Sequence, residues 1–155
     1  MTRSPLARVI AVNAGLVAAV LLGAELIFGT WLFGPSFGAL NLPRDVVRRF
    51  DAGGLRPADG PVLYSRDRWG LRGRYESPAN IGVLAVGGST TNEMYVADGE
   101  IWTDRLGRSF AEAGIPLSVV NAGAEGQSTV GHIRNFDTWF KLIPDLKFRY
   151  LLAYL

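Results

Sequence analysis

Ser89 follows two consecutive glycines, Gly87 and Gly88, at the end of a short apolar run. Such a pair permits a tight turn from a strand into a helix, and this turn leaves the serine at the rim with backbone N–H groups aimed at the same point. Acyl transfer requires this combination, because the hydroxyl is the nucleophile and the N–H groups stabilise the oxyanion. A plain turn in which Ser89 caps the following helix fits the same residues, and they leave both interpretations open.

A second glycine-rich loop, residues 121–128, follows another apolar run. Its glycines, Gly123 and Gly126, permit close approach of the backbone to a ligand. Phosphate binding is the weaker interpretation of both loops, because the sequence has neither Gly-x-Gly-x-x-Gly nor a Gly-Lys-Ser/Thr loop, and the second run ends in Asn121 rather than in an acid. Taken alone, the second loop is as open to a structural explanation as the first.

Two amphipathic segments accompany these loops. Residues 100–113 are expected to form a helix that stops at Gly114. Its expected buried side chains are Trp102, Leu106 and Phe110. The second expected helix follows the second loop and ends at Pro144. Its apolar residues, at spacings of three and four, are Ile133, Phe136, Phe140 and Ile143.

Short apolar runs at residues 81–86, 117–120 and 150–155 alternate with these helices and read as β-strands. Strands that alternate with single helices indicate β-α-β crossovers and a parallel sheet, so the fold class is α/β. Ligands of such sheets bind at the carboxyl ends of the strands. Both glycine-rich loops fall at that edge.

Taken together and in this order, the residues resemble the SGNH (GDSL-type) hydrolases, a resemblance that covers residues 81–155. The first block of the family ends in a turn that often reads Gly-Gly-Ser-Thr-Thr, as residues 87–91 do. The second block, Val-Asn-Ala-Gly-x-x-Gly, matches residues 120–126, and residues 149–155 match the strand that leads into Gly-x-Asn-Asp. The resemblance implies ester hydrolysis and a flavodoxin-like three-layer sandwich with strand order 2-1-3.

Carried over residue by residue, the resemblance makes Ser89 the nucleophile, with its own N–H and that of Gly126 in the oxyanion hole. Further residues of the two loops are candidates for substrate contact: Gly88, Thr90, Asn121, Gly123 and Gln127. Two departures, Gly88 where the family has Asp and Phe148 where a proline is frequent, affect the expected local geometry of the loops rather than the chemistry.

Two members of the family's catalytic set are not among these residues. The third oxyanion donor, an Asn, and the base, a His in an Asp-x-x-His block, are expected beyond Leu155, so the chain is expected to be incomplete and inactive alone. His132 is the single histidine. Its place near the start of the second helix favours a structural or rim role over that of the base.

Residues 9–33 are apolar apart from small residues and two polar ones, Asn13 and Glu25. As a helix they span about 37 Å, which exceeds the roughly 30 Å hydrocarbon core of a bilayer. We expect a retained membrane anchor over residues 1–34; a cleaved signal peptide is the alternative, and the run is long for one. Flanking charges decide the orientation poorly. The resemblance implies a bacterial inner-membrane protein with its domain outside the cytoplasm.

Residues 35–80 are rich in Gly, Pro and Arg, and they read as a linker with extended pieces and a short helix across residues 43–50. Within this linker, residues 64–73 interleave arginines with glycines. That segment could wrap the edge of the domain or bind a ligand, and wrapping is the better expectation. The predicted organisation is thus an anchor, a linker and the hydrolase-like residues 81–155.

The composition excludes several classes. Formal net charge is only +2, and the arginines do not line one helix face, so nucleic acid is not an expected partner. The absence of cysteine excludes disulfides and thiolate metal sites, and no ligand spacing for a metal is present. Two hypotheses follow: a membrane-anchored serine esterase or acylhydrolase without a cofactor, and a non-catalytic membrane-tethered binding or assembly module. The sequence leaves the oligomeric state open.

Overall fold

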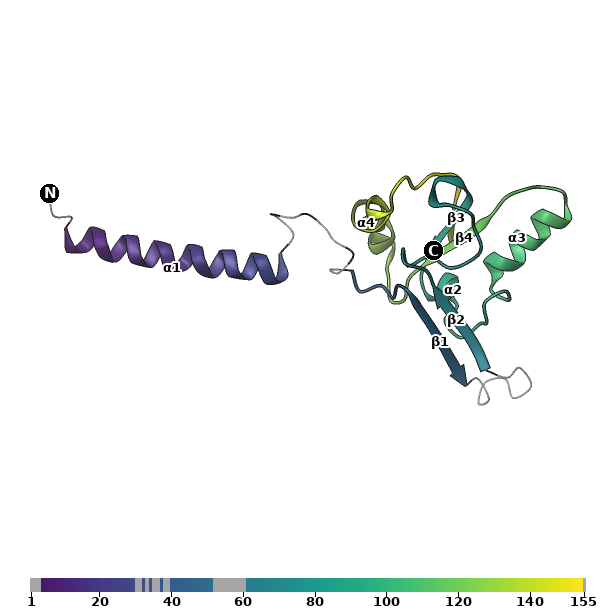
Figure 1. Ribbon diagram of the computed structural model, residues 1–155, viewed down its shortest axis with the longest axis horizontal. Coiled ribbons are helices and arrows are strands. Elements are labelled where there is room, and N and C mark those ends of the chain that lie inside the picture. Colours follow the sequence, from purple (N-terminus) through teal and green to yellow (C-terminus); the bar gives the residue numbers. More distant parts are fainter. Residues whose placement is uncertain are drawn as a thin grey trace. The chain divides into compact units, whose positions relative to one another are not determined.

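The structure, a computed structural model of the 155-residue chain, describes residues 4–29, 32, 34, 37, 40–51 and 61–154. The chain divides into two compact units, residues 1–39 and residues 40–155. The first unit contains one long helix, α1, and the second contains the strands β1 to β5 and the helices α2 to α4 (Figure 1).

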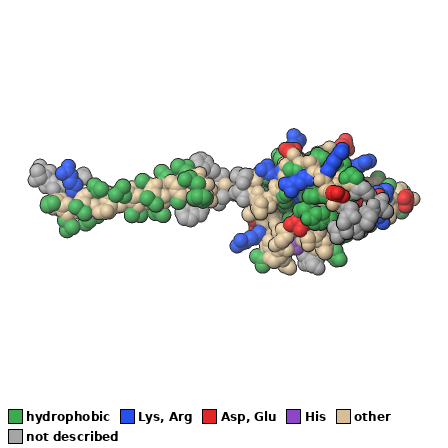
Figure 2. Space-filling view, turned by 90° about the horizontal axis from the view of Figure 1, so that it is seen from below, with side chains coloured by type: hydrophobic (Ala, Val, Ile, Leu, Met, Phe, Trp, Pro, Cys, Tyr) green, Lys and Arg blue, Asp and Glu red, His purple; other side chains and the backbone are tan. Residues whose placement is uncertain are grey.

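Helix α1 (Pro5–Phe28) begins where the side chain of Ser4 accepts a hydrogen bond from the backbone N–H of Ala7, at 3.2 Å. Hydrophobic side chains cover its length (Figure 2), and none of its residues is buried. Its 24 residues span about 36 Å, enough for a bilayer core of roughly 30 Å. The expected apolar helix is confirmed over residues 9–28, and residues 30, 31 and 33 lie outside the described residues. A membrane anchor and a signal sequence both fit its length and composition.

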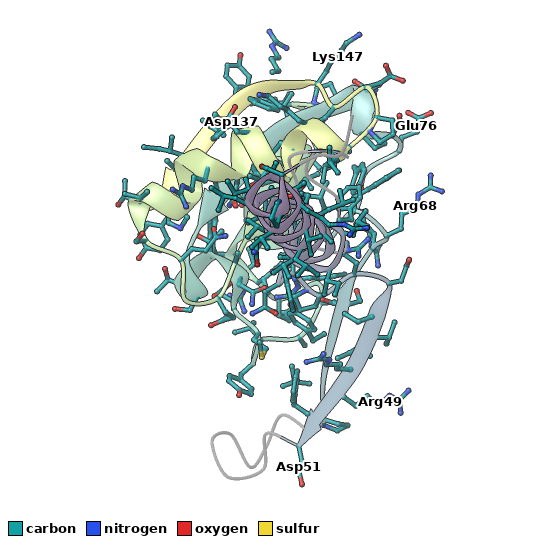
Figure 3. The ribbon with its side chains drawn as sticks, turned by 90° about the vertical axis from the view of Figure 1, so that its left-hand side faces the viewer. Arg49, Asp51, Arg68, Glu76, Asp137 and Lys147 are labelled. Atoms are coloured by element: carbon teal, nitrogen blue, oxygen red, sulfur yellow. The ribbon has the colours of Figure 1, made fainter. Side chains whose placement is uncertain are left out.

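Strands β1 (Val46–Asp51) and β2 (Pro61–Arg66) form an antiparallel pair with Val46 opposite Arg66. The short helix expected across residues 43–50 is therefore wrong. Strand β1 begins with two β-branched residues, Val46 and Val47. Its backbone hydrogen bonds are formed with β2, so strand pairing outweighs local helix propensity. Charged side chains of the hairpin, such as Arg49, point outward (Figure 3).

Three parallel strands form the sheet of the second unit, in the order β4-β3-β5. Their bounds are Val119–Gly123 for β4, Ile81–Gly87 for β3 and Phe148–Tyr154 for β5. The parallel sheet and the strand order 2-1-3 are confirmed. The second loop begins later than expected, because the residues from Asn121 to Gly123 pair with β3 and belong to β4.

Helices α3 (Trp102–Glu112) and α4 (Thr129–Thr138) lie on opposite sides of this sheet (Figure 1). The first matches the expected helix and ends before Gly114, but its fully buried residue is Thr103, whereas Trp102, Leu106 and Phe110 are half-buried. The outer side of α3 carries no further element among the described residues, so large side chains on its flank stay partly in solvent.

Helix α4 is shorter than expected, and a 3₁₀ turn (Phe140–Leu142) follows it. The expected apolar face is wrong at Ile133, whose exposed fraction is 64%. The helix instead buries His132 and Asn135. Both carry polar groups, and for this reason hydrophobic spacing alone assigns the helix the wrong rotation.

The buried core is centred on β3 and β4, every residue of which except Gly82 is buried. β5 pairs with β3 on one side, and Tyr150, Leu151 and Tyr154 keep about half of their surface exposed. Within the described residues, the sheet is therefore buried at its β4 edge and exposes apolar side chains at its β5 edge.

The close approach of α2 (Ser89–Asn92) to β4 generates a first prediction. A Cβ atom at Gly123 would overlap the backbone nitrogen of Asn92, so Gly123→Ala forces the two segments apart. We expect the substitution to lower the free energy of unfolding by about 2 kcal/mol, measured by urea unfolding of the full chain in mild detergent.

Gly88→Ala is the matched control, because the nearest atom to a Cβ there is the carbonyl oxygen of Gln127 at 3.7 Å, an ordinary contact. Its φ of −85° suits any residue. Equal unfolding midpoints for the two variants would contradict the packing role assigned to Gly123.

Candidate active site

The Ser89 turn joins the end of β3 to α2. Gly88 occupies the N-cap position, and Ser89 is the first helical residue, so its hydroxyl is not the cap of this helix. Ser89 and Thr90 are exposed, whereas Thr91 and Asn92 are buried. The four-residue helix ends at Glu93, which adopts a left-handed conformation with φ of 48°. The turn thus presents the serine hydroxyl at the surface and anchors itself by the two residues that follow.

The second loop leaves β4 after Gly123 and turns at Gly126, which is exposed and has a φ of +68°. That conformation favours glycine. The next residue, Gln127, is half-buried, and its side-chain amide pairs with that of Asn135 through two hydrogen bonds of 3.0 and 2.7 Å. Ser128 then caps α4 by accepting a hydrogen bond from the backbone of Gly131.

The two loops meet at the carboxyl edge of the sheet, as expected. The backbone N–H of Ala124 donates to the carbonyl of Gly87 at 2.9 Å. A hydrogen bond of 2.7 Å joins the side-chain amide of Asn92 to the carboxylate of Glu125. The structure therefore brings the Ser89 turn next to the loop that carries Gly126.

Asn121 and Gly123, expected to contact a substrate, are both buried. Asn121 donates from its side chain to the carbonyl of Thr91 and to the hydroxyl of Thr103, and it accepts from the N–H of Gly123. Its amide therefore holds α2 and α3 against the end of β4. Among the candidate loop residues, Ser89, Thr90 and Gly126 are exposed, and Gly88 and Gln127 are half-buried.

An aromatic pair flanks the Ser89 turn on another side. The indole N–H of Trp102 donates to the carbonyl of Thr90 at 3.2 Å, and the ring makes an edge contact with Tyr154, with centroids 6.1 Å apart. The exposed fraction of Tyr154 is 52%. These rings place apolar surface close to the residue that follows Ser89.

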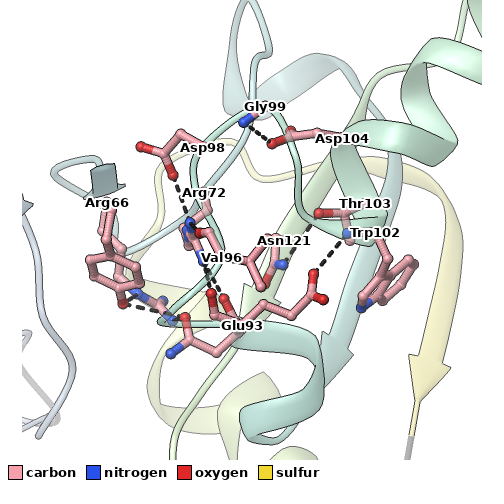
Figure 4. Close-up of polar contacts among 12 residues, drawn as sticks. Arg66, Arg72, Glu93, Val96, Asp98, Gly99, Trp102, Thr103, Asp104 and Asn121 are labelled. Carbon is pink, nitrogen blue, oxygen red and sulfur yellow. Dashed lines mark hydrogen bonds and ion pairs between the residues drawn. The ribbon is translucent and has the colours of Figure 1, made fainter. Parts of the chain in front are cut away.

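Arg66 is the first residue of the candidate site that the sequence analysis does not single out. Its side chain is buried, and Figure 4 draws it among the polar contacts around α2. It donates to four acceptors, namely Tyr64 Oη, Gly70 O, Asn92 Oδ1 and Gly123 O. Burial lowers the pKa of Arg66 from its usual value, and the contact with Tyr64 opposes this shift. The side chain thus joins the hairpin to both glycine-rich loops.

Arg72 is the second such residue, and it holds the segment that follows α2. It forms an ion pair of 2.6 Å with Asp98 and lies over the ring of Tyr64, 4.4 Å from the centroid. Its further acceptors are the backbone carbonyls of Asn92, Glu93 and Val96. Its neighbours in sequence, Arg68 and Arg74, are exposed, and Arg68 points outward in Figure 3.

The only available signal for these two arginines is their place in the glycine-interleaved segment. Their acceptors are mainly backbone carbonyls and side chains distant in sequence, and no local pattern encodes those contacts. The segment itself wraps the domain: the carboxylate of Asp67 accepts from the backbones of Trp69 and Leu71 and from Tyr75 Oη. Burial raises the pKa of Tyr75 above its usual value.

His132 is buried on α4, and neither ring nitrogen has a hydrogen-bond partner among the described residues. Those residues also contain no group of three or more His, Cys, Asp or Glu side chains that could hold a metal ion. The arrangement at the sheet edge thus consists of an exposed hydroxyl, adjacent backbone loops and a buried polar network.

A scan of protein-family models finds no match to this chain. Searches of curated proteins and of solved structures find no match either. The fold is mixed α/β with a parallel three-stranded sheet, preceded by one long apolar helix.

The ion pair between buried Arg72 and half-buried Asp98 generates a second prediction. Arg72→Met removes the charge and leaves Asp98 and three backbone carbonyls without their donor. We expect a loss of about 2 kcal/mol in the free energy of unfolding, because removing the buried guanidinium group leaves the backbone carbonyls around it without a donor. Asp98→Asn keeps an acceptor for Arg72 and is expected to cost about 1 kcal/mol. Urea unfolding measures both.

Arg74→Met serves as the control, because Arg74 is an exposed arginine of the same segment. Its effect is expected to stay within about 0.5 kcal/mol. If Arg72→Met were as mild as Arg74→Met, the network around Arg72 would not support the segment after α2.

Proposed function

We propose that this chain is a membrane-anchored ester hydrolase of the SGNH (GDSL) type, with a flavodoxin-like α/β sandwich and Ser89 as its nucleophile. One observation carries the proposal: the exposed Ser89 turn lies beside the Gly126 loop, joined to it by the hydrogen bond from Ala124 N–H to Gly87 O. The sequence resembles the blocks of that family in these two loops. The loops meet because each follows a strand of the same parallel sheet, and the carboxyl ends of such strands lie at one edge.

In the proposed reaction, Ser89 Oγ forms a bond with the carbonyl carbon of an ester, and the hydroxyl proton passes through a general base to the departing alcohol. The N–H groups of Ser89 and Gly126 donate to the oxyanion while it carries negative charge. Water then cleaves the acyl-enzyme, releasing the acid and restoring the serine. The proposal assigns the nucleophile and two donors, and it requires no cofactor.

The general base is not assigned to His132. The ring of that histidine faces inward from α4 and is buried, whereas the Ser89 hydroxyl is at the surface. The proposed substrate is an O-acetyl or acyl ester of an envelope polysaccharide or lipid. The membrane-length helix α1 supports that choice, as does the apolar surface of Trp102 and Tyr154 beside the turn.

The third prediction concerns the reactivity of Ser89. When membranes that contain the protein expressed from its complete coding sequence are treated with a fluorophosphonate probe, we expect mass spectrometry to find the adduct on Ser89. Ser89→Ala should abolish labelling and hydrolysis of p-nitrophenyl acetate, because no other described serine lies in this turn. Ser128→Ala is the control, since that side chain caps α4 and should leave labelling in place.

The outcomes separate the two classes of function. An adduct on Ser128, or ester hydrolysis that survives Ser89→Ala, would overturn the assignment of the nucleophile. If the folded product of the complete coding sequence showed neither labelling nor hydrolysis, the esterase proposal would be contradicted and the non-catalytic, membrane-tethered binding module would be favoured.

The fourth prediction concerns the anchor. We propose that α1 is retained in a bacterial inner membrane with the second unit outside the cytoplasm. Alkaline phosphatase fused after Gly34 should then be active in a bacterial host, and the fusion should stay with the membranes after carbonate extraction at its uncleaved mass. An inactive phosphatase fusion beside an active cytoplasmic reporter would reverse the orientation, and a shortened soluble product would identify a signal sequence.

A further inference from the structure

We propose that Arg66, Asn92 and Glu125 act together as a loop clamp that fixes the separation between the Ser89 turn and the Gly126 loop, with Arg66 as a positioning residue. The consequence for ester hydrolysis rests on the proposed function. The coupling of the two loops rests on the contacts alone and is tested separately.

The clamp consists of a continuous chain of side-chain contacts. Arg66 donates to Asn92 Oδ1 at 2.5 Å and also to the backbone carbonyl of Gly123. The amide nitrogen of Asn92 donates in turn to Glu125 Oε1 at 2.7 Å. Asn92 closes the helix that begins at Ser89, and Glu125 precedes Gly126. Each loop is thereby held at a position close to its proposed reactive group.

The chemistry of Asn92 makes the clamp directional. Its oxygen accepts from Arg66 and from Tyr64 Oη, so its nitrogen is the atom left to face the carboxylate of Glu125. An Asp at this position would repel Glu125, and an apolar residue would leave the Arg66 donors unpaired. The amide is therefore the group that joins a cation on one side to an anion on the other.

The burial of Arg66 indicates a specific role for the guanidinium group. Only 3% of its surface is exposed, and a buried cation is costly unless several acceptors surround it. The planar fork meets the hairpin through Tyr64 Oη and the segment after the hairpin through Gly70 O, while its Nη2 donates to Asn92 Oδ1 at the Ser89 turn and to Gly123 O at the end of β4. A lysine ammonium cannot reproduce this spread of donors, because its donors radiate from one atom.

A clamp of this kind affects catalysis through geometry. Misplacing a reacting group by about 1 Å can cost a factor of about 100 in rate. None of the three clamp residues is assigned to the reacting atoms. Loosening the clamp should therefore lower kcat while leaving KM nearly unchanged, and it should loosen both loops at once.

The experiment uses the protein expressed from its complete coding sequence, in detergent, and compares Glu125→Ala, Arg66→Lys and the control Glu112→Ala. Glu125 is exposed, so its truncation removes one end of the clamp without emptying the core, and Glu112 is an exposed glutamate of α3. We expect Glu125→Ala to slow fluorophosphonate labelling of Ser89 and to lower kcat by about 10-fold with KM unchanged. Arg66→Lys should lower both by a larger factor, and Glu112→Ala should change neither.

Hydrogen–deuterium exchange supplies a readout that needs no activity. Glu125→Ala and Arg66→Lys should both accelerate exchange in peptides that cover residues 89–93 and residues 123–127, whereas thermal unfolding shows whether each variant is folded. Glu125→Gln should restore most of the protection, because an amide oxygen still accepts from Asn92.

The outcomes are distinguishable. Unchanged exchange in Glu125→Ala, or acceleration in only one of the two loops, overturns the clamp. Accelerated exchange in both loops together with a wild-type protein that never labels at Ser89 supports the clamp and refutes the esterase. A rise in KM with unchanged kcat overturns the positioning role and makes Glu125 a substrate contact.

Discussion

The buried cation of Arg66 is the interaction on which the arrangement of this domain depends. A guanidinium group in the interior must find acceptors, and here it finds them on the hairpin, on α2 and at the end of β4. The hairpin, α2 and β4 are therefore held together by the requirement to satisfy one charge. Arg72 adds a second buried cation that ties the segment after α2 to the same ring of Tyr64. The edge of a small sheet is thus organised by hydrogen bonds as much as by apolar packing.

Sequence reasoning succeeded where local pattern decides structure. The apolar runs around Leu84 and Leu151 give β3 and β5, and the β-α-β order requires a parallel sheet with both glycine-rich loops at one edge. It failed where distant groups decide. Residues 46–50 form a strand because β2 pairs with them, and α4 turns His132 inward although Ile133 is the more apolar residue. Nothing in the sequence distinguishes Arg66 from a surface arginine, because the fold brings its acceptors to it.

Contacts with residues distant in sequence also explain why the glycines predict the structure of the two loops only in part. Gly123 was expected to admit a ligand, but the backbone of Asn92 occupies that space. Asn121 is a candidate for substrate contact in the sequence, but in the fold its amide forms hydrogen bonds with Thr91, Thr103 and the N–H of Gly123. Side chains in a loop can face a substrate. At the end of a strand, as here, they instead hold the neighbouring segments in place.

The distinction between residues that packing explains and residues that it does not explain decides how far the resemblance to the esterases supports the proposed function. Packing alone explains Gly87 and Gly123, because each lies against a neighbouring backbone, and it explains Asn121, because its side chain hydrogen-bonds to one. The left-handed turn favours glycine at Gly126. Any protein with this loop geometry would need similar residues, with or without catalysis. Ser89 differs from them. It is exposed, and the cap position of α2 is filled by Gly88, so neither burial nor capping explains a serine there. Packing therefore gives no reason for the hydroxyl of Ser89, whereas the proposed ester hydrolysis does.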